Sequence, residues 1–450
     1  MSFPRYEQYK QSGVEWLGEV PAHWTVERLK FLTSRIGSGK TPLGGNETYQ
    51  DSGVLFLRSQ NVHDDGLRLE DVVCIAQVVD DSMSSSRVQA GDILLNITGA
   101  SIGRTCIVPQ GFPPANVNQH VCVVRVSIPE QATFLAWLLK SAQIKAQIDY
   151  VQDGAAREGL NFQQIGSFNV PLPPVSERAD ICRVLSAETA KIDTLVEEQK
   201  RLIELLKEKR QAVISRAVTK GLNPAVPMKD SEVHWLGRIP AHWDAVALKR
   251  ISPIQTVGIV VNPSIYVARE GLPFLYGGDI REGRIDLVEC RRISAEDSER
   301  NVKTRLQAGD LVTVRVGAPG VTAVVPHEAE GGNCASVMLI RRGDFDSRWL
   351  CYTMNDRVVR FQVEVVQYGA AQEQFNISHA VEFILPRPGR GEQKLIADHL
   401  DKATAKLDEL VAEALAAMTL LSERRSALIA AAVTGKIGVR GAVALQEMPA

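Results

Sequence analysis

The sequence has few of the features that secreted, membrane-spanning or strongly basic proteins require. Its seven cysteines are scattered and odd in number, with no C-x-x-C pair, so neither a disulfide framework nor a zinc site is indicated. No apolar run approaches the roughly 20 residues that cross a bilayer, and the first residues lack a signal-peptide core. The formal net charge of −2 gives no overall support for nucleic-acid binding, although a local basic groove would suffice. We therefore expect a soluble, cytoplasmic protein.

The sequence also lacks a complete catalytic motif. The string G-S-G-K-T at 37–41 has the end of a phosphate-binding loop, but Ser34 replaces the first glycine of such a loop. The string N-P-S-I at 262–265 lacks the second proline and the aromatic residue of an adenine-methylating loop. The E-x-K spacing at 198–200, which metal-dependent nucleases use, falls inside a helical run. We therefore expect a binding protein with no catalytic residue, no metal site and no cofactor of its own.

What the chain does contain is an internal duplication of domain size. The string S-G-V-E-W-L-G-E-V-P-A-H-W returns as S-E-V-H-W-L-G-R-I-P-A-H-W, and Q-A-G-D and G-A-A-x-E-x-x-N also occur twice. The paired copies begin at residues 12 and 231, 89 and 307, and 154 and 369. This period is far longer than the roughly 20–50 residues of solenoid repeats, so each copy is a whole domain with an appendage. A length of 450 residues agrees with two domains.

Each half opens with a region of short, strand-like runs. Examples are V-L-F-L at 54–57, I-L-L-N-I at 93–97 and V-C-V-V-R-V at 121–126, separated by Gly, Asp and Pro. Their length and punctuation predict strands joined by turns. The amphipathic segment 133–150 predicts one helix among them. The globular part of each half is therefore expected to be α+β.

Each half closes with a long helical run. After Pro174 the chain continues to Lys220 without a glycine or proline, and apolar residues recur at alternating steps of four and three. This spacing predicts a coiled-coil seam. The predicted seam residues are Ile181, Leu185, Ile192, Leu195, Leu202, Leu206, Val213, Ile396, Leu400, Leu407, Leu410, Leu421 and Leu428.

The length of these helices favours pairing between them. Roughly 40 residues at about 1.5 Å each make about 60 Å, too long for one small domain to cover. We expect the two helices to form an antiparallel coiled coil with pseudo-two-fold symmetry. The alternative is that each helix packs separately on its own domain.

The two halves have similar strand sequences but different polar residues directly after those strands. The strand G-V-L-F-L at 53–57 matches G-L-P-F-L at 271–275, but the next four residues change from R-S-Q-N to Y-G-G-D. After the shared Gly-Asp pair, N-I-T at 96–98 becomes V-R-V at 314–316. Two different recognition surfaces would show this pattern, and so would ordinary drift in loops.

Together these features resemble the specificity (S) subunits of type I restriction–modification systems. The motifs that carry the resemblance are P-A-H-W with a following leucine (Leu29, Leu248), the G-x-T-P turn at 39–42, the Gly-Asp strands at 91–94 and 309–312, and A-V-T-G-K-I at 432–437. They cover nearly the whole chain in the family's order. The second half lacks the G-x-T-P turn.

The resemblance implies a DNA-reading scaffold without an active site. In this family each globular domain is a target-recognition domain for one half of a bipartite, asymmetric DNA target, and the long helices set the spacing. Two methyltransferase (M) subunits and restriction (R) subunits join the scaffold, so S-adenosylmethionine, ATP and Mg²⁺ belong to the partner subunits. The resulting complex is a DNA adenine methyltransferase and an ATP-dependent endonuclease. The alternatives are a single-chain DNA-modifying enzyme and a coiled-coil scaffold for non-nucleic-acid partners.

The resemblance also implies a division of the chain and a set of DNA contacts. The expected division is 1–172 and 223–389 for the two recognition domains, 173–222 and 390–437 for the long helices, and 438–450 for a tail. Base edges are read by Arg, Asn, Gln and similar groups, whereas Lys and Arg bind phosphates. The candidate DNA contacts are therefore Lys40, Arg58, Gln60, Asn61, Asn96 and Arg157 in the first domain and Tyr276, Asp279, Arg315 and Gln372 in the second.

Overall fold

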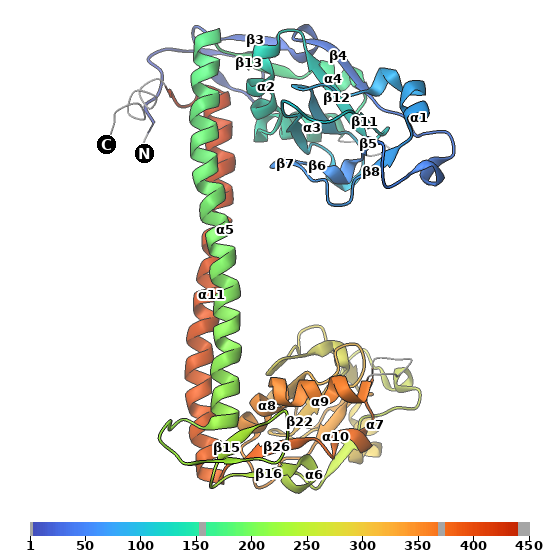
Figure 1. Ribbon diagram of the computed structural model, residues 1–450, viewed down its shortest axis with the longest axis vertical. Coiled ribbons are helices and arrows are strands. Elements are labelled where there is room, and N and C mark those ends of the chain that lie inside the picture. Colours follow the sequence, from blue (N-terminus) through green and yellow to red (C-terminus); the bar gives the residue numbers. More distant parts are fainter. Residues whose placement is uncertain (1–2, 153–158, 368–373, 440–450) are drawn as a thin grey trace. The chain divides into compact units, whose positions relative to one another are not determined.

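The chain folds into two compact units. The computed structural model describes residues 3–152, 159–367 and 374–439 (Figure 1). Unit 1 comprises Met1–Gln199 and Ala416–Ala450, and unit 2 comprises Lys200–Leu415. Each unit therefore combines one globular domain with one part of each of two long helices, α5 (Val175–Lys220) and α11 (Arg390–Val433).

The domain of unit 1 is built from two small sheets and short helices. A four-stranded antiparallel sheet has the order β10 (Thr105–Ile107), β9 (Ile93–Asn96), β12 (Val121–Val126) and β4 (Thr33–Ser38). A three-stranded sheet has the order β11 (Ala115–Val117), β5 (Val54–Leu57) and β8 (Val73–Ile75), with β5 and β11 parallel. Two-stranded pairs are β1 (Tyr9–Gln11) with β2 (Glu19–Pro21), β3 (Thr25–Arg28) with β13 (Asn169–Leu172), and β6 (Val62–His63) with β7 (Gly66–Leu67). The short helices are α1 (Gln77–Ser82), α2 (Ala132–Leu139), α3 (Ala142–Gln152) and α4 (Phe162–Gly166).

The domain of unit 2 repeats this plan. The four-stranded sheet has the order β17 (Gln255–Val257), β25 (Met338–Ile340), β22 (Leu311–Thr313) and β23 (Thr322–Val324). The three-stranded sheet has the order β21 (Arg291–Ile293), β18 (Leu272–Leu275) and β24 (Asn333–Cys334). Two-stranded pairs are β14 (Met228–Asp230) with β15 (Arg238–Pro240), β16 (Asp244–Ala247) with β26 (Ile384–Arg387), and β19 (Ile280–Arg281) with β20 (Arg284–Ile285). The short helices are α6 (Leu248–Ile251), α7 (Ala295–Arg300), α8 (Ser347–Asn355), α9 (Arg357–Gln367) and α10 (Ile377–Ala380).

The mixed α+β architecture agrees with the sequence, but one helix boundary does not. The single helix expected over 133–150 is wrong, because α2 ends at Leu139 and α3 begins at Ala142. The break turns the chain so that residues of both helices, such as Leu138 and Ile148, enter the same core. No helix among the described residues is both long and apolar enough to span a membrane.

The duplicated Q-A-G-D motif builds the turn before an inner strand. In unit 1 the Asp92 carboxylate accepts a hydrogen bond from the backbone N–H of Gln89 at 2.7 Å and from the guanidinium of Arg125 at 2.7 Å. The glycine between them has φ of 86°, a left-handed conformation that a side chain would strain. In unit 2 the Asp310 carboxylate makes the same bond to the N–H of Gln307 at 3.0 Å. The motif is duplicated because both domains need this turn.

The duplicated P-A-H-W motif ties each domain to the start of a long helix. His23 hydrogen-bonds through Nε2 to Glu177 of α5 at 2.8 Å, and His242 bonds in the same way to Glu392 of α11 at 2.9 Å. Trp24, which follows His23, is fully buried in the core of unit 1. The repeat thus marks two equivalent joints between a domain and its helix.

The long helices pair in antiparallel fashion inside each unit. In unit 1, Asp193 of α5 forms an ion pair with Arg425 of α11 at 2.9 Å. In unit 2, Arg210 of α5 pairs with Asp408 of α11 at 3.2 Å. The two acidic residues are separated by 215 positions, and so are the two arginines, so one ion pair is the duplicated copy of the other. The expected paired coil is confirmed, and the alternative, in which each helix packs separately on its own domain, is wrong.

The seam of this coil is shifted from the strict heptad positions. Leu195, Leu202 and Leu410 were expected in the seam, but their side chains are 44%, 42% and 38% exposed. From Ile181 to Ala217 the least exposed positions recur about every 3.6 residues, as in a straight helix, whereas a heptad repeats every ~3.5. Of the other expected positions, Ile181, Leu185, Ile192, Leu206, Ile396, Leu400 and Leu407 lie buried, and Val213, Leu421 and Leu428 lie half-buried.

Candidate nucleic-acid interface

The strand registers bring the variable loops of unit 1 to one edge of the domain. The end of β5 lies beside the end of its parallel neighbour β11 and beside the start of β8. The start of β12 lies beside the ends of β9 and β4. Only residues 118–120 separate β11 from β12, so both sheets present their loops together. This loop edge of unit 1 comprises residues 39–49, 58–61, 68–72, 97–101 and 118–120.

Unit 2 forms the equivalent edge. Leu275 of β18 pairs with Cys334 of β24, and Phe274 pairs with Arg291 at the start of β21. Met338 at the start of β25 faces the last residues of both β17 and β22. The loop edge of unit 2 therefore comprises residues 258–267, 276–279, 286–290, 315–320 and 335–337.

A polar hollow opens at the loop edge of unit 1. It has a volume of about 430 Å³, and its lining consists of small, polar and basic side chains without a carboxylate: Ser59, Gln60, Thr98, Gly99, Ala100, Ser101, Arg104 and His120. The His120 ring bonds to the Thr98 hydroxyl at 2.6 Å and to the Gln119 amide at 2.9 Å. Neutral donors and acceptors beside an arginine are the groups that read base edges and bind phosphates.

Three of the expected DNA contacts of unit 1 reach this edge. Lys40 and Gln60 are exposed there. Arg58 is half-buried, its Nη2 donates to the Asp71 carbonyl at 2.7 Å, and its guanidinium lies 5.7 Å from the centre of the Tyr49 ring. Arg157 lies outside the described residues.

Asn61 and Asn96 have a different role from the one expected. Asn61 is 1% exposed, and its side chain accepts from the Arg58 N–H at 2.9 Å and donates to the Arg68 carbonyl at 2.9 Å. Asn96 is fully buried, and its amide donates to the Ser59 carbonyl at 2.8 Å. Both amides hold the loop in shape from inside. The expectation that they face DNA is therefore corrected by their burial.

The expected contacts of unit 2 are half-buried. The Asp279 carboxylate accepts from the Tyr276 N–H at 2.7 Å, which is the same loop bond that Asn61 makes in unit 1. Burial is the largest influence on Asp279 and raises its pKa above the usual range. Arg315 donates through Nε to the Phe375 carbonyl at 3.0 Å, and burial lowers its pKa. Gln372 lies outside the described residues.

Sequence reasoning missed three residues at the loop edges. Arg104 and His120 line the hollow of unit 1, and Arg291 opens β21 in unit 2. His120 directly precedes an apolar strand run, so its place at a strand end could have been inferred. Arg104 and Arg291 carry no such signal, because their positions depend on which strands pair.

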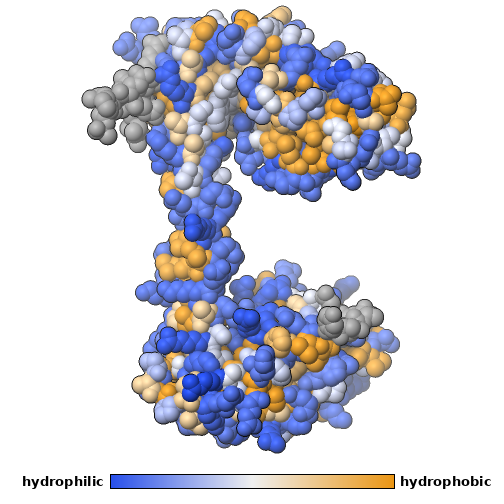
Figure 2. Space-filling view, viewed as in Figure 1, coloured by the Kyte–Doolittle hydropathy of each residue, from blue (hydrophilic) through white to orange (hydrophobic). Residues whose placement is uncertain are grey.

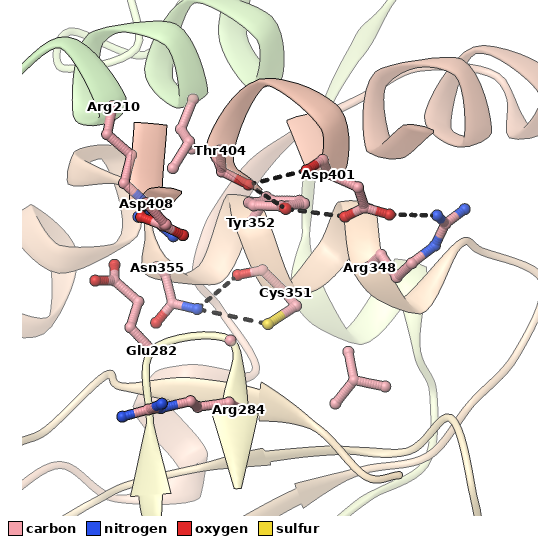
Figure 3. Close-up of a pocket in the computed structure, with 13 residues that line it drawn as sticks. Arg210, Glu282, Arg284, Arg348, Cys351, Tyr352, Asn355, Asp401, Thr404 and Asp408 are labelled. Carbon is pink, nitrogen blue, oxygen red and sulfur yellow. Dashed lines mark hydrogen bonds and ion pairs between the residues drawn. The ribbon is translucent and has the colours of Figure 1, made fainter. Parts of the chain in front are cut away.

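A polar hollow of unit 2 is a structural joint. It has a volume of about 270 Å³ and lies between the β19–β20 turn, α8 and the long helices (Figure 3). Arg348 binds Asp401 at 2.5 Å and Asp398 at 2.8 Å, and the Tyr352 hydroxyl donates to Asp401 at 2.9 Å. Burial raises the pKa of Tyr352 and of the Cys351 thiol to about 12, so neither ionises at neutral pH. These groups fasten the domain to its helix and do not form a catalytic set.

The remaining cysteines and acidic residues do not suggest other chemistry. Burial also raises the pKa of Cys106, Cys122 and Cys334 to about 12, which keeps these thiols neutral. Across residues 3–152, 159–367 and 374–439, no group of three His, Cys, Asp or Glu side chains is arranged to hold a metal ion.

Comparisons with known proteins agree with the duplicated architecture. Residues 35–205 match the family described as the type I restriction modification DNA specificity domain. The putative type I restriction enzyme MjaX specificity subunit of Methanocaldococcus jannaschii is 22% identical over 451 residues, which cover 98% of this chain and 99% of that protein. The type I restriction enzyme EcoBI specificity subunit of Escherichia coli is 23% identical over 337 residues, or 72% of this chain and 70% of that protein.

A solved structure shares the fold. It is described as "Structural basis underlying complex assembly and conformational transition of the type I R-M system", and its chain is 17% identical, with a TM-score of 0.69. The match covers 92% of this chain and 98% of that one. The family match and the relatives agree with the motifs repeated in both units, and the chain is similar over nearly its whole length to specificity subunits of type I restriction–modification systems.

Proposed function

We propose that this chain is the DNA-reading subunit of a type I restriction–modification complex and has no catalytic activity of its own. Each unit reads one half of a bipartite, asymmetric DNA target through its loop edge. The long helices, which contribute residues to both units, set the distance between the two half-sites. The chain acts in the cytoplasm, where bacterial and archaeal DNA lies.

The observation that carries this proposal is that the two units share one fold but differ in the residues at their loop edges. Both units contain the same sheets, the same Gly-Asp turn and the same joint to the long helices. At the loop edges, Arg58 and Gln60 of unit 1 correspond to Tyr276 and Gly278 of unit 2. Sequence is read by the side chains that reach base edges, so two copies with different tips read two different half-sites.

The partners follow from the same role. Two M subunits dock on the chain and R subunits complete the nuclease, so S-adenosylmethionine, ATP and Mg²⁺ are bound by those partners. Apolar surface on the long helices supports such docking (Figure 2). In unit 1 the side chains of Leu195 and Leu420 are 44% and 65% exposed, and in unit 2 those of Leu205 and Leu415 are 52% and 51% exposed. Exposed apolar patches of this kind mark protein contacts.

Methylome sequencing tests the proposal directly. The chain is expressed with its cognate M subunit in a host that lacks DNA methylation, and methylated adenines are mapped genome-wide. We expect one asymmetric motif in two parts separated by an unread spacer. A genome without new methylation, or a motif in one undivided part, would contradict the proposal.

A biochemical assay separates the chain's own activity from that of its partners. The purified chain alone should neither transfer methyl groups nor cut DNA, whereas the complex with M subunits should methylate. Gln60→Ala should weaken specific binding by the complex because this side chain is exposed at the loop edge. Gln77→Ala, on α1 and outside the loop edge, is the matched control and should leave binding unchanged.

A further inference from the structure

The two loop edges share a feature that alignment of the halves hides. In unit 1 the Arg58 guanidinium lies 5.7 Å from the centre of the Tyr49 ring. In unit 2 the Arg291 guanidinium lies 4.1 Å from the centre of the Tyr276 ring. Tyr276 aligns with Arg58, so the cation in one unit corresponds to the aromatic ring in the other. Each unit therefore has an arginine stacked on a tyrosine, but the two stacks use different alignment positions.

Both stacks rest on the same part of the core. Tyr49 packs on Phe56 with ring centres 5.6 Å apart, and Tyr276 packs on Phe274 with ring centres 5.1 Å apart. Phe56 and Phe274 are equivalent in the duplication, and both are fully buried. The rigid platform is therefore kept, although the arginine reaches it from the end of β5 in unit 1 and from the start of β21 in unit 2.

The arginine of unit 2 is available for a ligand. Arg291 is exposed, and no carboxylate among the described residues forms an ion pair with it. A free arginine side chain carries about 2 kcal/mol of rotamer entropy, and stacking on a ring removes part of that cost before binding. The Tyr276 side chain thus positions the guanidinium through the ring contact and a side-chain hydrogen bond, and the exposed guanidinium forms no ion pair with a carboxylate of the described residues.

A planar fork of donors fits one base better than the others. Guanine presents two acceptors, N7 and O6, in the major groove, whereas adenine presents an acceptor and a donor. Phosphate also accepts from arginine, but a flexible lysine or arginine suffices for it. Asp279 lies within electrostatic reach of Arg291, and its carboxylate would repel a phosphate more than a neutral base.

We infer that Arg291, stacked on Tyr276, is a specificity-determining residue of unit 2 that bonds to the N7 and O6 atoms of a guanine in its half of the DNA target. This inference rests on the proposed function and adds to it a residue, a base and a positioning platform. Arg58 on Tyr49 is the corresponding stack of unit 1.

The test uses the full chain in complex with its M subunits. Arg291→Lys keeps the charge and removes the planar fork, so the preference for one G·C pair in one half-site should fall about 5- to 140-fold. Binding is measured by competition between the target and duplexes changed at single base pairs. Arg292→Lys is the matched control, because the next residue of β21 points to the opposite face of the strand and keeps the net charge.

Two variants of Tyr276 test the platform. Tyr276→Phe keeps the ring and should retain the preference. Tyr276→Leu removes it and should lower the preference for the same base pair that Arg291→Lys affects. Loss at a different base pair would show that the ring does not position Arg291.

The outcomes separate the inference from the proposed function. Unchanged discrimination in Arg291→Lys would show that the residue does not read a base and would overturn the inference. Arg291→Gln then separates the two remaining cases, because a uniform loss of affinity for all duplexes with a salt dependence reduced by about one ion would identify a phosphate contact, whereas no loss would place the residue outside the interface. If the wild-type complex shows no sequence preference at all, the proposed function itself is wrong, whatever the variants do.

Discussion

The position of the coiled-coil seam can be tested with two leucines that a heptad pattern treats as equal. Leu202 and Leu206 both lie in unit 2 and both occupy strict heptad positions. In the structure, Leu206 is 8% exposed and Leu202 is 42% exposed. Leu206→Ala should therefore cost about 2–5 kcal/mol, because it removes buried methyl groups and leaves a cavity. Leu202→Ala should change the stability by no more than about 0.5 kcal/mol, since alanine also favours a helix.

Scanning calorimetry of the full chain measures both effects. For a unit of this size about 1 kcal/mol shifts the Tm by roughly 2–4 °C, so Leu206→Ala should lower the transition of unit 2 by at least about 4 °C. Leu205→Ala is a second control, because Leu205 is next to Leu206 and 52% exposed. Equal losses for Leu202→Ala and Leu206→Ala would show that the helices pair in strict heptads and that the seam described above is wrong.

Three further results are expected. Asn96→Ala should destabilise unit 1 by about 1–3 kcal/mol in urea unfolding, because it removes a buried amide that donates to the Ser59 carbonyl and the Ser101 hydroxyl. Gln60→Ala should leave the stability unchanged, and equal effects would contradict their assigned positions. Arg348→Met should lower the unfolding free energy of unit 2 by roughly 1 kcal/mol, and the difference should shrink at 1 M salt because these ion pairs are partly exposed; a loss that salt does not change would mean that packing dominates. Inserting four residues after Gln199 and four after Leu415 adds roughly 6 Å to each helix, which corresponds to one or two base pairs at about 3.4 Å each. The unread spacer in the methylated motif should lengthen by that amount. An unchanged spacer at full affinity would show that the long helices do not set the distance between the two half-sites.

The roles of the duplicated motifs could be predicted from the sequence because each one depends mainly on residues close together in the chain. The Gly-Asp turn needs a left-handed glycine and a carboxylate that accepts a hydrogen bond from a backbone N–H three residues earlier. The four adjacent residues Q-A-G-D meet both requirements. The P-A-H-W motif needs a buried tryptophan and a histidine that bonds to a glutamate at the start of a helix. The period of the long helices was also readable, but only approximately. The predicted seam positions, spaced alternately four and three residues apart from Ile181, no longer coincide with the buried positions at Leu195, which lies within four helical turns.

The residues exposed at the loop edge could not be predicted from the sequence, because their positions depend on pairing between strands that are distant in the chain. Asn61 and Asn96 have the residue type that reads bases, and only the register of β5, β9 and β12 shows that both are enclosed. A short polar residue at a strand end has two common roles, a contact to a ligand or a bond that closes its own loop. Sequence alone does not separate these roles, since the same amide serves both.

Arg291 shows why comparison of the halves also misleads. It aligns with Val73, so a search for equivalent recognition residues passes over it and selects Tyr276 as the counterpart of Arg58. The structure indicates that what is equivalent is a place on the fold, above a buried phenylalanine, where a guanidinium meets an aromatic ring. In unit 1 the loop 39–49 supplies the ring and the loop after β5 supplies the cation, whereas in unit 2 the loop after β18 supplies the ring and the start of β21 supplies the cation, so different segments reach the same place. Recognition residues in such a duplicated chain are therefore better compared by their position at the loop edge than by their position in the alignment.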